Sequence, residues 1–298
     1  MKWKKHGLVI KPSKDIWWMQ THAMVPTLQQ VEESLYKIYF SGRNDKNQSH
    51  IGYALIDLKN PTDVLEYSKD PVLTPGELGC FDDNGVTPSC IIKNDSETLL
   101  YYIGWNPGST TRMHIYGGLA ISYDNGITFE RYSKAPILER CKVNPYINTA
   151  PFALKESHTE WKMYYVSGVE WVNKDFPRYN IQFATSANGK EWNREGHVAI
   201  DFEGEENALA RPFVIKEEGI YKMWFASKGS SYRMKYAESE DGVNWKRVDS
   251  KINIDVSPAG PDSEMLEYAA IVTWNGKKFM FYNGNNYGQD GILLATEE

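Results

Sequence analysis

The sequence contains little cysteine, no long hydrophobic run and no excess of positive charge. Its three cysteines, Cys80, Cys90 and Cys141, are odd in number and follow no metal-binding spacing, so we expect reduced thiols. No stretch approaches the roughly 18 apolar residues of a membrane span, and the basic N-terminus lacks the apolar core of a signal peptide. The net charge of −6, without a basic stripe, argues against a nucleic-acid partner. Together these absences predict a cytoplasmic protein with no membrane or nucleic-acid partner.

One aromatic strand pattern occurs five times along the chain. "YKIYFSG", at residues 36–42, returns as "LLYYIGW", "WKMYYVSG", "YKMWFAS" and "KFMFYNG", at residues 99–105, 161–168, 221–227 and 278–284. Aromatic and β-branched side chains in alternation are typical of a pleated, packed strand. Repetition of one unit along a chain indicates a repeat architecture.

Each copy lies inside a larger unit of four strands. An apolar strand precedes it and carries Pro26, Pro88, Pro151 or Pro212, with Ala270 as the fifth equivalent. A third strand follows, then a turn and a weaker fourth strand at residues 66–73, 129–138, 192–200 and 245–254. Three of these turns, "SYDNGITF", "SANGKEW" and "SEDGVNW", have the residues of a tight hairpin, so we interpret them as structural. The fifth unit has no fourth strand, but residues 3–10, "WKKHGLVI", show the same pattern and can supply it.

These units predict an all-β fold, a five-bladed β-propeller of four-stranded antiparallel blades. The N-terminal strand would complete the last blade and close the ring. Radial repetition leaves only short, protected strand edges. We expect residues 1–298 to form this single domain, because no linker or long helical pattern interrupts the repeats.

The ends of the innermost strands predict the site, because in a propeller they surround a central channel. Aromatic, amide, carboxylate and guanidinium groups gather there, and such a mixture suits a sugar substrate. The residues expected to bind it are His22, Arg43, Trp105, Asn148, Glu170, Trp171, Arg211, Lys228 and Tyr268. A purely structural role for Trp105 and Trp171, as packing between blades, fits the same pattern.

Five blades, inner strands with proline and "S-x-D-G-x-x-W" turns resemble the five-bladed carbohydrate-active propellers. These include the arabinanase and β-xylosidase family, the invertase and levansucrase families and the mannoside phosphorylases, and the first turn resembles the Asp-box of sialidases. The resemblance covers the whole chain. It implies catalytic carboxylates on inner strands, but the matching positions hold Val25, Ala150 and Ala210. The usual catalytic set is therefore absent at those positions.

Three carboxylates remain close to the predicted funnel, Asp83, Glu206 and Glu267. Glycoside hydrolysis needs one carboxyl group as proton donor and another as nucleophile or base, about 5–9.5 Å apart. We therefore expect these three residues to be catalytic, with Glu206 and Asp83 as the favoured pair. The alternative is a structural ion pair between Glu206 and Arg211.

We expect no metal and no cofactor. His22, His50 and His114 lie near strand ends, but their spacing does not require convergence on a metal. "GELGCFDDNG" contains glycines but opens no helix, so it is no phosphate-binding loop.

Two classes of function fit these residues. The first is a glycoside-hydrolase-like enzyme acting on a small or activated sugar, neutral or acidic, or a related phosphorylase. Arg211 and Lys228 could meet an acidic group on that sugar. The second class is a protein that binds a sugar or assists surface-polysaccharide synthesis without hydrolysis, and the apolar replacements motivate it. An interaction scaffold is a third possibility, although a scaffold needs no polar funnel.

Overall fold

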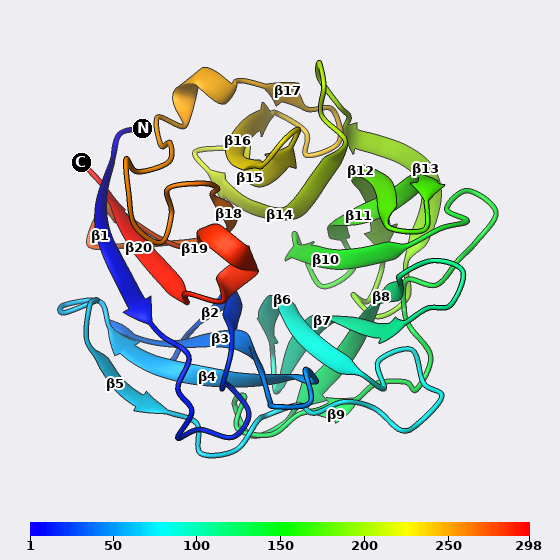
Figure 1. The fold of residues 1–298 in the computed structure, drawn as a ribbon. Coiled ribbons are helices and arrows are strands. Elements are labelled where there is room, and N and C mark those ends of the chain that lie inside the picture. Colours follow the sequence, from blue (N-terminus) through cyan, green and yellow to red (C-terminus); the bar gives the residue numbers. More distant parts are fainter.

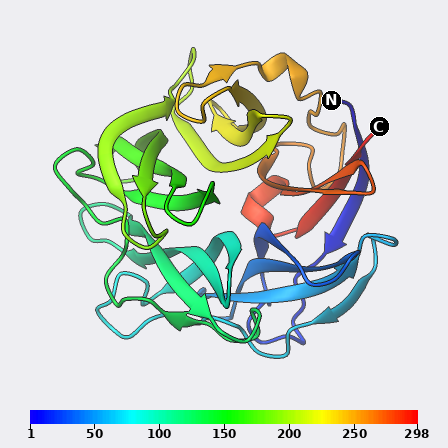
Figure 2. The same ribbon diagram turned by 180° about the vertical axis from the view of Figure 1, so that it is seen from behind.

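The computed structural model describes residues 1–298, and the all-β prediction is confirmed. Strands lie in groups around a common centre, with both termini side by side at the outer edge (Figure 1). The view from behind shows the same circular arrangement (Figure 2). The only helical segments are two 3-10 turns, η1 (Asp249–Lys251) and η2 (Asn285–Gly288). Neither is long and apolar enough to cross a membrane.

Antiparallel pairing divides the strands into five groups of four. Group one contains β2 (Ala23–Gln30), β3 (Leu35–Arg43), β4 (Ser49–Asp57) and β5 (Val64–Tyr67). Group two contains β6 (Gly85–Asn94), β7 (Glu97–Pro107), β8 (Met113–Ser122) and β9 (Glu130–Arg131). Group three contains β10 (Asn148–Lys155), β11 (Trp161–Asn173), β12 (Phe176–Ser186) and β13 (Asn193–Ile200).

Group four contains β14 (Ala208–Glu217), β15 (Ile220–Lys228), β16 (Tyr232–Ser239) and β17 (Lys246–Arg247). Group five contains β18 (Glu267–Trp274), β19 (Lys277–Asn283), β20 (Ile292–Glu297) and the N-terminal strand β1 (Trp3–Ile10). Single parallel pairs join the first four groups, β4 to β6, β8 to β10 and β12 to β14. Group five forms a separate four-stranded sheet.

Three fourth strands are shorter than the sequence predicted. β5 ends at Tyr67, β9 at Arg131 and β17 at Arg247, although the pattern suggested strands to residues 73, 138 and 254. Pro71 and Pro136 lie in the missing parts of β5 and β9, and proline cannot donate to a ladder. In these two groups the chain rejoins the third strand only through isolated bridges at Leu73 and Leu138.

The repeated second strand is buried on both faces, which explains its composition. On β3, Tyr36, Ile38 and Phe40 pack in a cluster that also contains Phe279 and Phe281 of group five. Tyr39, on the opposite face, packs with residues of group two. Alternation along the strand therefore places large side chains on both neighbouring groups.

The repeated turns join consecutive groups. Tyr39, Tyr101 and Tyr164 each donate a hydroxyl hydrogen bond to a turn glycine of the next group, Gly126, Gly189 or Gly242, at 2.6–2.7 Å. The aromatic residue after the turn packs on the same tyrosine; for example, the Tyr164 and Trp245 ring centres are 5.3 Å apart. The turns were predicted as structural, and here they connect the first four groups in sequence. We call these three hydrogen bonds the Tyr–Gly links.

Candidate functional site

The first strands of four groups carry a β-bulge at one equivalent residue. Val25, Ala150, Arg211 and Tyr268 have φ angles of 59°, 49°, 44° and 58°, in the left-handed region. The ladder register shifts at each of them. Such backbone conformations cost about 1–3 kcal/mol each and concentrate at functional sites. All four residues line one central cavity.

In three groups, the proline that the first strands share stands directly after the bulge. Pro26, Pro151 and Pro212 follow Val25, Ala150 and Arg211, at positions where no ladder hydrogen bond is made. In group five the residue after the bulge is Ala269, so the predicted equivalence of Ala270 was one residue too late. In group two, Pro88 lies on the N-terminal side of the register shift, and its ring excludes a positive φ.

The central cavity has a volume of about 610 Å³ and is lined by residues of all five groups. It brings together six of the nine residues predicted to bind substrate, His22, Arg43, Trp105, Arg211, Lys228 and Tyr268. The Trp105 indole N–H donates to the Ser49 hydroxyl at 2.8 Å, and the Arg43 guanidinium lies 5.6 Å from its ring centre. Trp105 is therefore fixed in orientation as one wall of the cavity.

Arg211 closes the floor of the cavity and is 2% exposed. Its Nη1 donates to the carbonyls of Tyr268 and Ala269 at 3.2 and 2.6 Å, both in group five. Its Nη2 donates to the Pro26 carbonyl and the Thr27 hydroxyl of group one. Because bulges release carbonyl oxygens from the ladder, Arg211 satisfies acceptors that would otherwise be buried without a donor. Burial lowers the pKa of Arg211 to about 9, so it stays charged at neutral pH.

Glu267 lies behind a cluster of tyrosines on the cavity wall. It is fully buried, and neither carboxyl oxygen has a hydrogen-bond partner. Burial therefore raises its pKa well above the ordinary value and favours the uncharged, protonated form. Burial also raises the pKa of the Tyr179, Tyr232 and Tyr268 hydroxyls, and nearby Glu267 adds to each shift. These three tyrosines line the cavity, and the Tyr179 and Tyr232 hydroxyls are hydrogen-bonded at 2.6 Å.

His22 is a second neutral polar group in the cavity. It is 8% exposed, and its Nδ1 is 2.8 Å from the Thr21 hydroxyl. Burial, followed by the nearby charge of Arg43, lowers its pKa to about 4. At neutral pH, His22 therefore meets a ligand as an uncharged imidazole.

None of the three predicted catalytic carboxylates lines the cavity, and Glu206 and Asp83 are held by partners elsewhere. Glu206 accepts bidentate hydrogen bonds from Arg247 at 2.6 and 2.8 Å, and a further one from Ser227. Although burial opposes ionisation, these bonds lower the pKa of Glu206 to about 2. The sequence suggested an ion pair between Glu206 and Arg211 as the alternative. In the structure, Glu206 pairs with Arg247 instead. Asp83 accepts a hydrogen bond from the Gly79 amide at 2.8 Å within its own loop.

Glu206 belongs to a set of loop anchors that the sequence did not reveal. In three other groups, a residue before the first strand accepts a hydrogen bond from a tyrosine of the second strand. The pairs are Asp82–Tyr102, Asn144–Tyr165 and Asp262–Tyr282, each at 2.9 Å. Glu206 and Ser227 make the corresponding contact in group four. Polar residues before the first strands therefore hold the entering loop in place.

Three predicted binding residues also lie outside the cavity lining. Asn148 is completely buried and donates to the Asn144 carbonyl at 3.0 Å, so its amide holds the loop. Glu170 and Trp171 lie in the long hairpin of β11 and β12, and Glu170 pairs with Arg178 at 2.7 Å. The tip of this hairpin does reach the cavity, through Asp175 and Phe176.

The sequence interpretation missed several cavity residues on third strands and their loops. Tyr179 and Tyr232 stand near the starts of β12 and β16, in the matching stretches "YNIQFATS" and "YRMKYAES". That shared tyrosine was a signal that could have identified both. Arg112 and Tyr287 lie in the loops that join second and third strands. Tyr287 and the preceding Asn286 both have a φ of 56°, which no local motif revealed.

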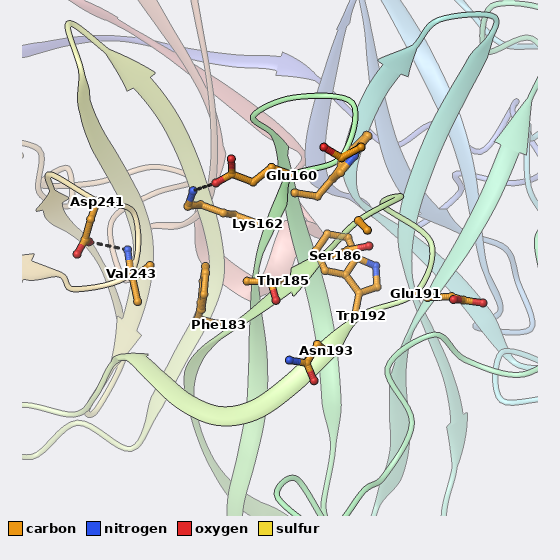
Figure 3. A pocket seen from close by; sticks show the side chains of 13 residues that line it. Glu160, Lys162, Phe183, Thr185, Ser186, Glu191, Trp192, Asn193, Asp241 and Val243 are labelled. Atoms are coloured by element: carbon orange, nitrogen blue, oxygen red, sulfur yellow. Dashed lines mark hydrogen bonds and ion pairs between the residues drawn. The ribbon is translucent and has the colours of Figure 1, made fainter.

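A second depression, of about 860 Å³, lies between groups three and four, away from these residues. Figure 3 shows Trp192, Phe183, Lys162 and Asp241 among its lining side chains. Two of its charged side chains have partners within the protein. Lys162 contacts Glu160 at 3.1 Å, and Asp241 accepts from the Val243 amide at 2.8 Å (Figure 3). No group of three or more His, Cys, Asp or Glu side chains in the protein could hold a metal ion.

Curated proteins with a similar sequence come from Mycobacterium tuberculosis. No protein-family model matches the chain. The uncharacterized protein Rv1502 of strain H37Rv is 37% identical over 300 residues, which covers 100% of both proteins. The uncharacterized protein MT1551 of strain CDC 1551 matches with the same identity and coverage.

Solved structures with a similar fold include glycoside hydrolases of propeller families. One glycoside hydrolase has a TM-score of 0.78 at 20% identity and covers 99% of this chain and 91% of its own. The complex of BT0996 with RGII has a TM-score of 0.76 at 19% identity, with the same coverage. A thermostable family-43 glycoside hydrolase has a TM-score of 0.72 at 16% identity. The match covers 92% of this chain and 88% of the hydrolase. At these identities, the similarity concerns the fold.

Proposed function

The chain belongs to the same family as Rv1502 of Mycobacterium tuberculosis, and we propose that it is a glycoside-hydrolase-like enzyme that binds a carbohydrate in its central cavity. The observation that carries this proposal is the composition of that cavity. The rings of Trp105, Tyr268 and Tyr287 stand beside the polar groups of His22 and Asn207. Aromatic faces pack against the C–H faces of a sugar, and the polar groups bond its hydroxyls. One structural neighbour is a complex with RGII, which also supports a sugar ligand.

We propose further that the five groups are the blades of one closed five-bladed propeller spanning residues 1–298. The pairing of β1 with β20 supports closure, because it adds the N-terminal strand to the sheet of the last three strands. The glycoside hydrolases of propeller families among the structural neighbours support the same architecture. In such a ring, the cavity lined by all five groups is the mouth of the central channel.

In the proposed reaction, Glu267 supplies the proton. Burial favours the protonated form of its carboxyl group. Because Glu267 does not line the cavity and its neighbour Tyr268 does, the proton passes to the substrate through the Tyr268 hydroxyl. The glycosidic C–O bond breaks, the leaving oxygen takes the proton, and a water molecule adds to the anomeric carbon. Asp175, the only carboxylate that lines the cavity, takes the proton from that water. Asp175 thus fills the role that the sequence had suggested for Asp83 or Glu206.

A panel of aryl glycosides and oligosaccharides tests this proposal. We expect turnover by the wild type, with loss of kcat but not of ligand binding in Glu267→Gln and Asp175→Asn. Glu170→Gln, which removes a carboxylate from the same hairpin as Asp175 but outside the cavity, is the matched control and should keep full activity. Turnover only in the presence of inorganic phosphate would identify a phosphorylase. Equal turnover by Glu267→Gln and wild type would exclude Glu267 as the proton donor.

Binding without hydrolysis is the second candidate function. The observation that favours it is the presence of Val25 and Ala150 at two bulge positions, where the resembling hydrolases place catalytic carboxylates. In this case sugars would raise the melting temperature of wild type and Glu267→Gln equally, and no glycoside would be cleaved.

A further inference from the structure

We propose that the sugar bound in the central cavity carries a phosphate group, held by Arg43, Arg112 and Lys228. This inference rests on the proposed carbohydrate site and names the class of its ligand. The three cations come from three groups of strands. Arg43 ends β3, Arg112 lies in the loop between β7 and β8, and Lys228 ends β15. All three line the same cavity.

The charge of the cavity is strongly one-sided. Arg211 adds a fourth cation on the floor, and Asp175 is the only carboxylate in the lining. None of these four cations takes part in any of the ion pairs of the protein. By contrast, Arg131, Arg178, Arg233 and Arg247 are all paired with carboxylates. Arg140 and Arg194 are also without an ion pair but lie outside the cavity, so three of the five unpaired arginines, Arg43, Arg112 and Arg211, line it.

Several of these cations have donors without a protein partner. The Nε atoms of Arg43 and Arg211 are buried and make no hydrogen bond, although Arg211 is almost completely enclosed. Lys228 Nζ contacts only a neutral group, the Tyr287 hydroxyl at 3.1 Å. Charged groups removed from water are costly unless an opposite charge compensates them. His22 is uncharged at neutral pH and Asp175 is the only carboxylate in the lining, so an anionic ligand is the missing partner.

Phosphate fits this set of donors better than a single carboxylate. A phosphate ester carries close to two negative charges and three acceptor oxygens, which several cations can share. Arg43 presents a guanidinium whose Nη1 is held by the Asn47 side-chain oxygen at 2.9 Å, and Lys228 adds a point charge from another direction. Trp105, under the Arg43 guanidinium, then provides an aromatic face beside the phosphate site. A sugar phosphate or nucleotide sugar combines these two features in one molecule.

Calorimetry with five probes tests the phosphate site: pyrophosphate, glucose 1-phosphate, UDP-glucose, glucuronate and glucose. We expect the three phosphorylated probes to bind, with an affinity that falls as salt concentration rises. Arg43→Gln and Lys228→Gln should each weaken pyrophosphate binding about tenfold, because each removes one charge-assisted contact. Arg140→Gln is the matched control, since Arg140 is exposed, unpaired and outside the cavity, and it should bind as the wild type does.

Three results would overturn the inference. Pyrophosphate binding that is absent, or equal in wild type and Lys228→Gln, would show that the cavity holds no phosphate site. Binding of glucuronate without pyrophosphate would assign the cations to a carboxylate. Binding of a neutral oligosaccharide with no preference for phosphorylated probes would refute the inference while leaving the proposed carbohydrate site intact. Conversely, pyrophosphate binding without recognition of any sugar would refute the proposed function alone.

Discussion

Arg211 donates a hydrogen bond of 2.6 Å to the carbonyl oxygen of Ala269, from group four to group five across the cavity floor. A second nitrogen of the same guanidinium reaches the Thr27 hydroxyl of group one at 2.9 Å. The same nitrogen also contacts the Ser89 carbonyl of group two at 3.4 Å, so one buried side chain connects the first strands of four groups. The bulges that aim residues into the cavity and the arginine that satisfies their carbonyls form one structural unit.

Replacement of Arg211 by methionine should destabilise the protein by about 2–4 kcal/mol, because several buried carbonyl oxygens would each lose a hydrogen-bond donor. Methionine has a similar length but no hydrogen to donate. Urea denaturation measures the change in free energy of unfolding. Arg140→Met, at an exposed arginine, should shift it by less than about 0.5 kcal/mol. A more stable Arg211→Met variant would mean that the cost of burying the charge exceeds the value of its hydrogen bonds.

Glu267→Gln should change how stability depends on pH. In the folded protein the pKa of Glu267 is raised above its ordinary value of 4.5. When the pH rises above 4.5, the unfolded chain therefore releases this proton while the folded protein still holds it. The contribution of Glu267 to stability is therefore full below pH 4.5 and decreases towards the folded-state pKa. We expect wild type to lose about 1.4 kcal/mol per pH unit relative to Glu267→Gln in that interval. Urea denaturation at pH 4, 6 and 8 would measure the free energy of unfolding of both proteins. If it depended on pH in the same way for wild type and Glu267→Gln, the pKa of Glu267 would not be raised in the folded protein.

Glu206→Gln should destabilise the protein at neutral pH and leave the cavity intact. Its folded-state pKa, lowered from 4.5 to about 2, makes the ionised form stabilising above pH 4.5, and that contribution is lost as the pH falls towards 2. We expect a loss of about 1–3 kcal/mol at pH 7 that disappears near pH 2. Thermal unfolding across this pH range measures it. Glu170→Gln, at the more exposed Glu170–Arg178 pair, should cost less than about 1 kcal/mol.

Gly85→Ala should displace Trp105 from the cavity wall. A Cβ atom at residue 85 would overlap with the indole nitrogen of Trp105 and with the Ser49 hydroxyl that accepts its hydrogen bond. We expect the indole N–H resonance of Trp105 to shift in NMR spectra and stability to fall by about 1–3 kcal/mol. In the control Gly229→Ala, the added Cβ would meet only the Glu205 carbonyl, at 3.8 Å. An unmoved Trp105 resonance in Gly85→Ala would show that this wall adapts.

The sequence predicted the strands well because their determinants are local. Alternating aromatic residues and the "N-G"- and "D-G"-type turns reveal second strands and hairpins without knowledge of distant residues. Arg43, Trp105 and Lys228 were also predictable, since each lies at the end of a repeated second strand where the repetition stops. The ends of the second strands lie at the central cavity because of the fold, so their position could be predicted without knowing which residues they carry.

The role of individual carboxylates could not be predicted because it depends on partners far along the chain. Glu206 is anchored by Arg247, and nothing near residue 206 indicates that pairing. Glu267 looked no different from Glu206 in sequence, yet it is buried without any partner. Tyr287 reaches the cavity through a backbone turn with positive φ that no glycine signalled.

The Tyr–Gly links span only three of the five junctions between neighbouring groups. At the equivalent positions of β15 and β19 the residues are Trp224 and Phe281, which have no hydroxyl. The same two junctions, on either side of group five, also lack the parallel strand pair that joins the other groups. Arg211 bridges both of them at once. Other side-chain contacts also cross them, including the hydrogen bonds between Asn283 and residues 23 and 25 and the ion pair between Lys278 and Glu217. Group five is thus joined to its neighbours by side chains, without a parallel strand pair. Amide hydrogens of β18 to β20 should therefore exchange first, and the cavity should open along the edge that carries Glu267 and Tyr268.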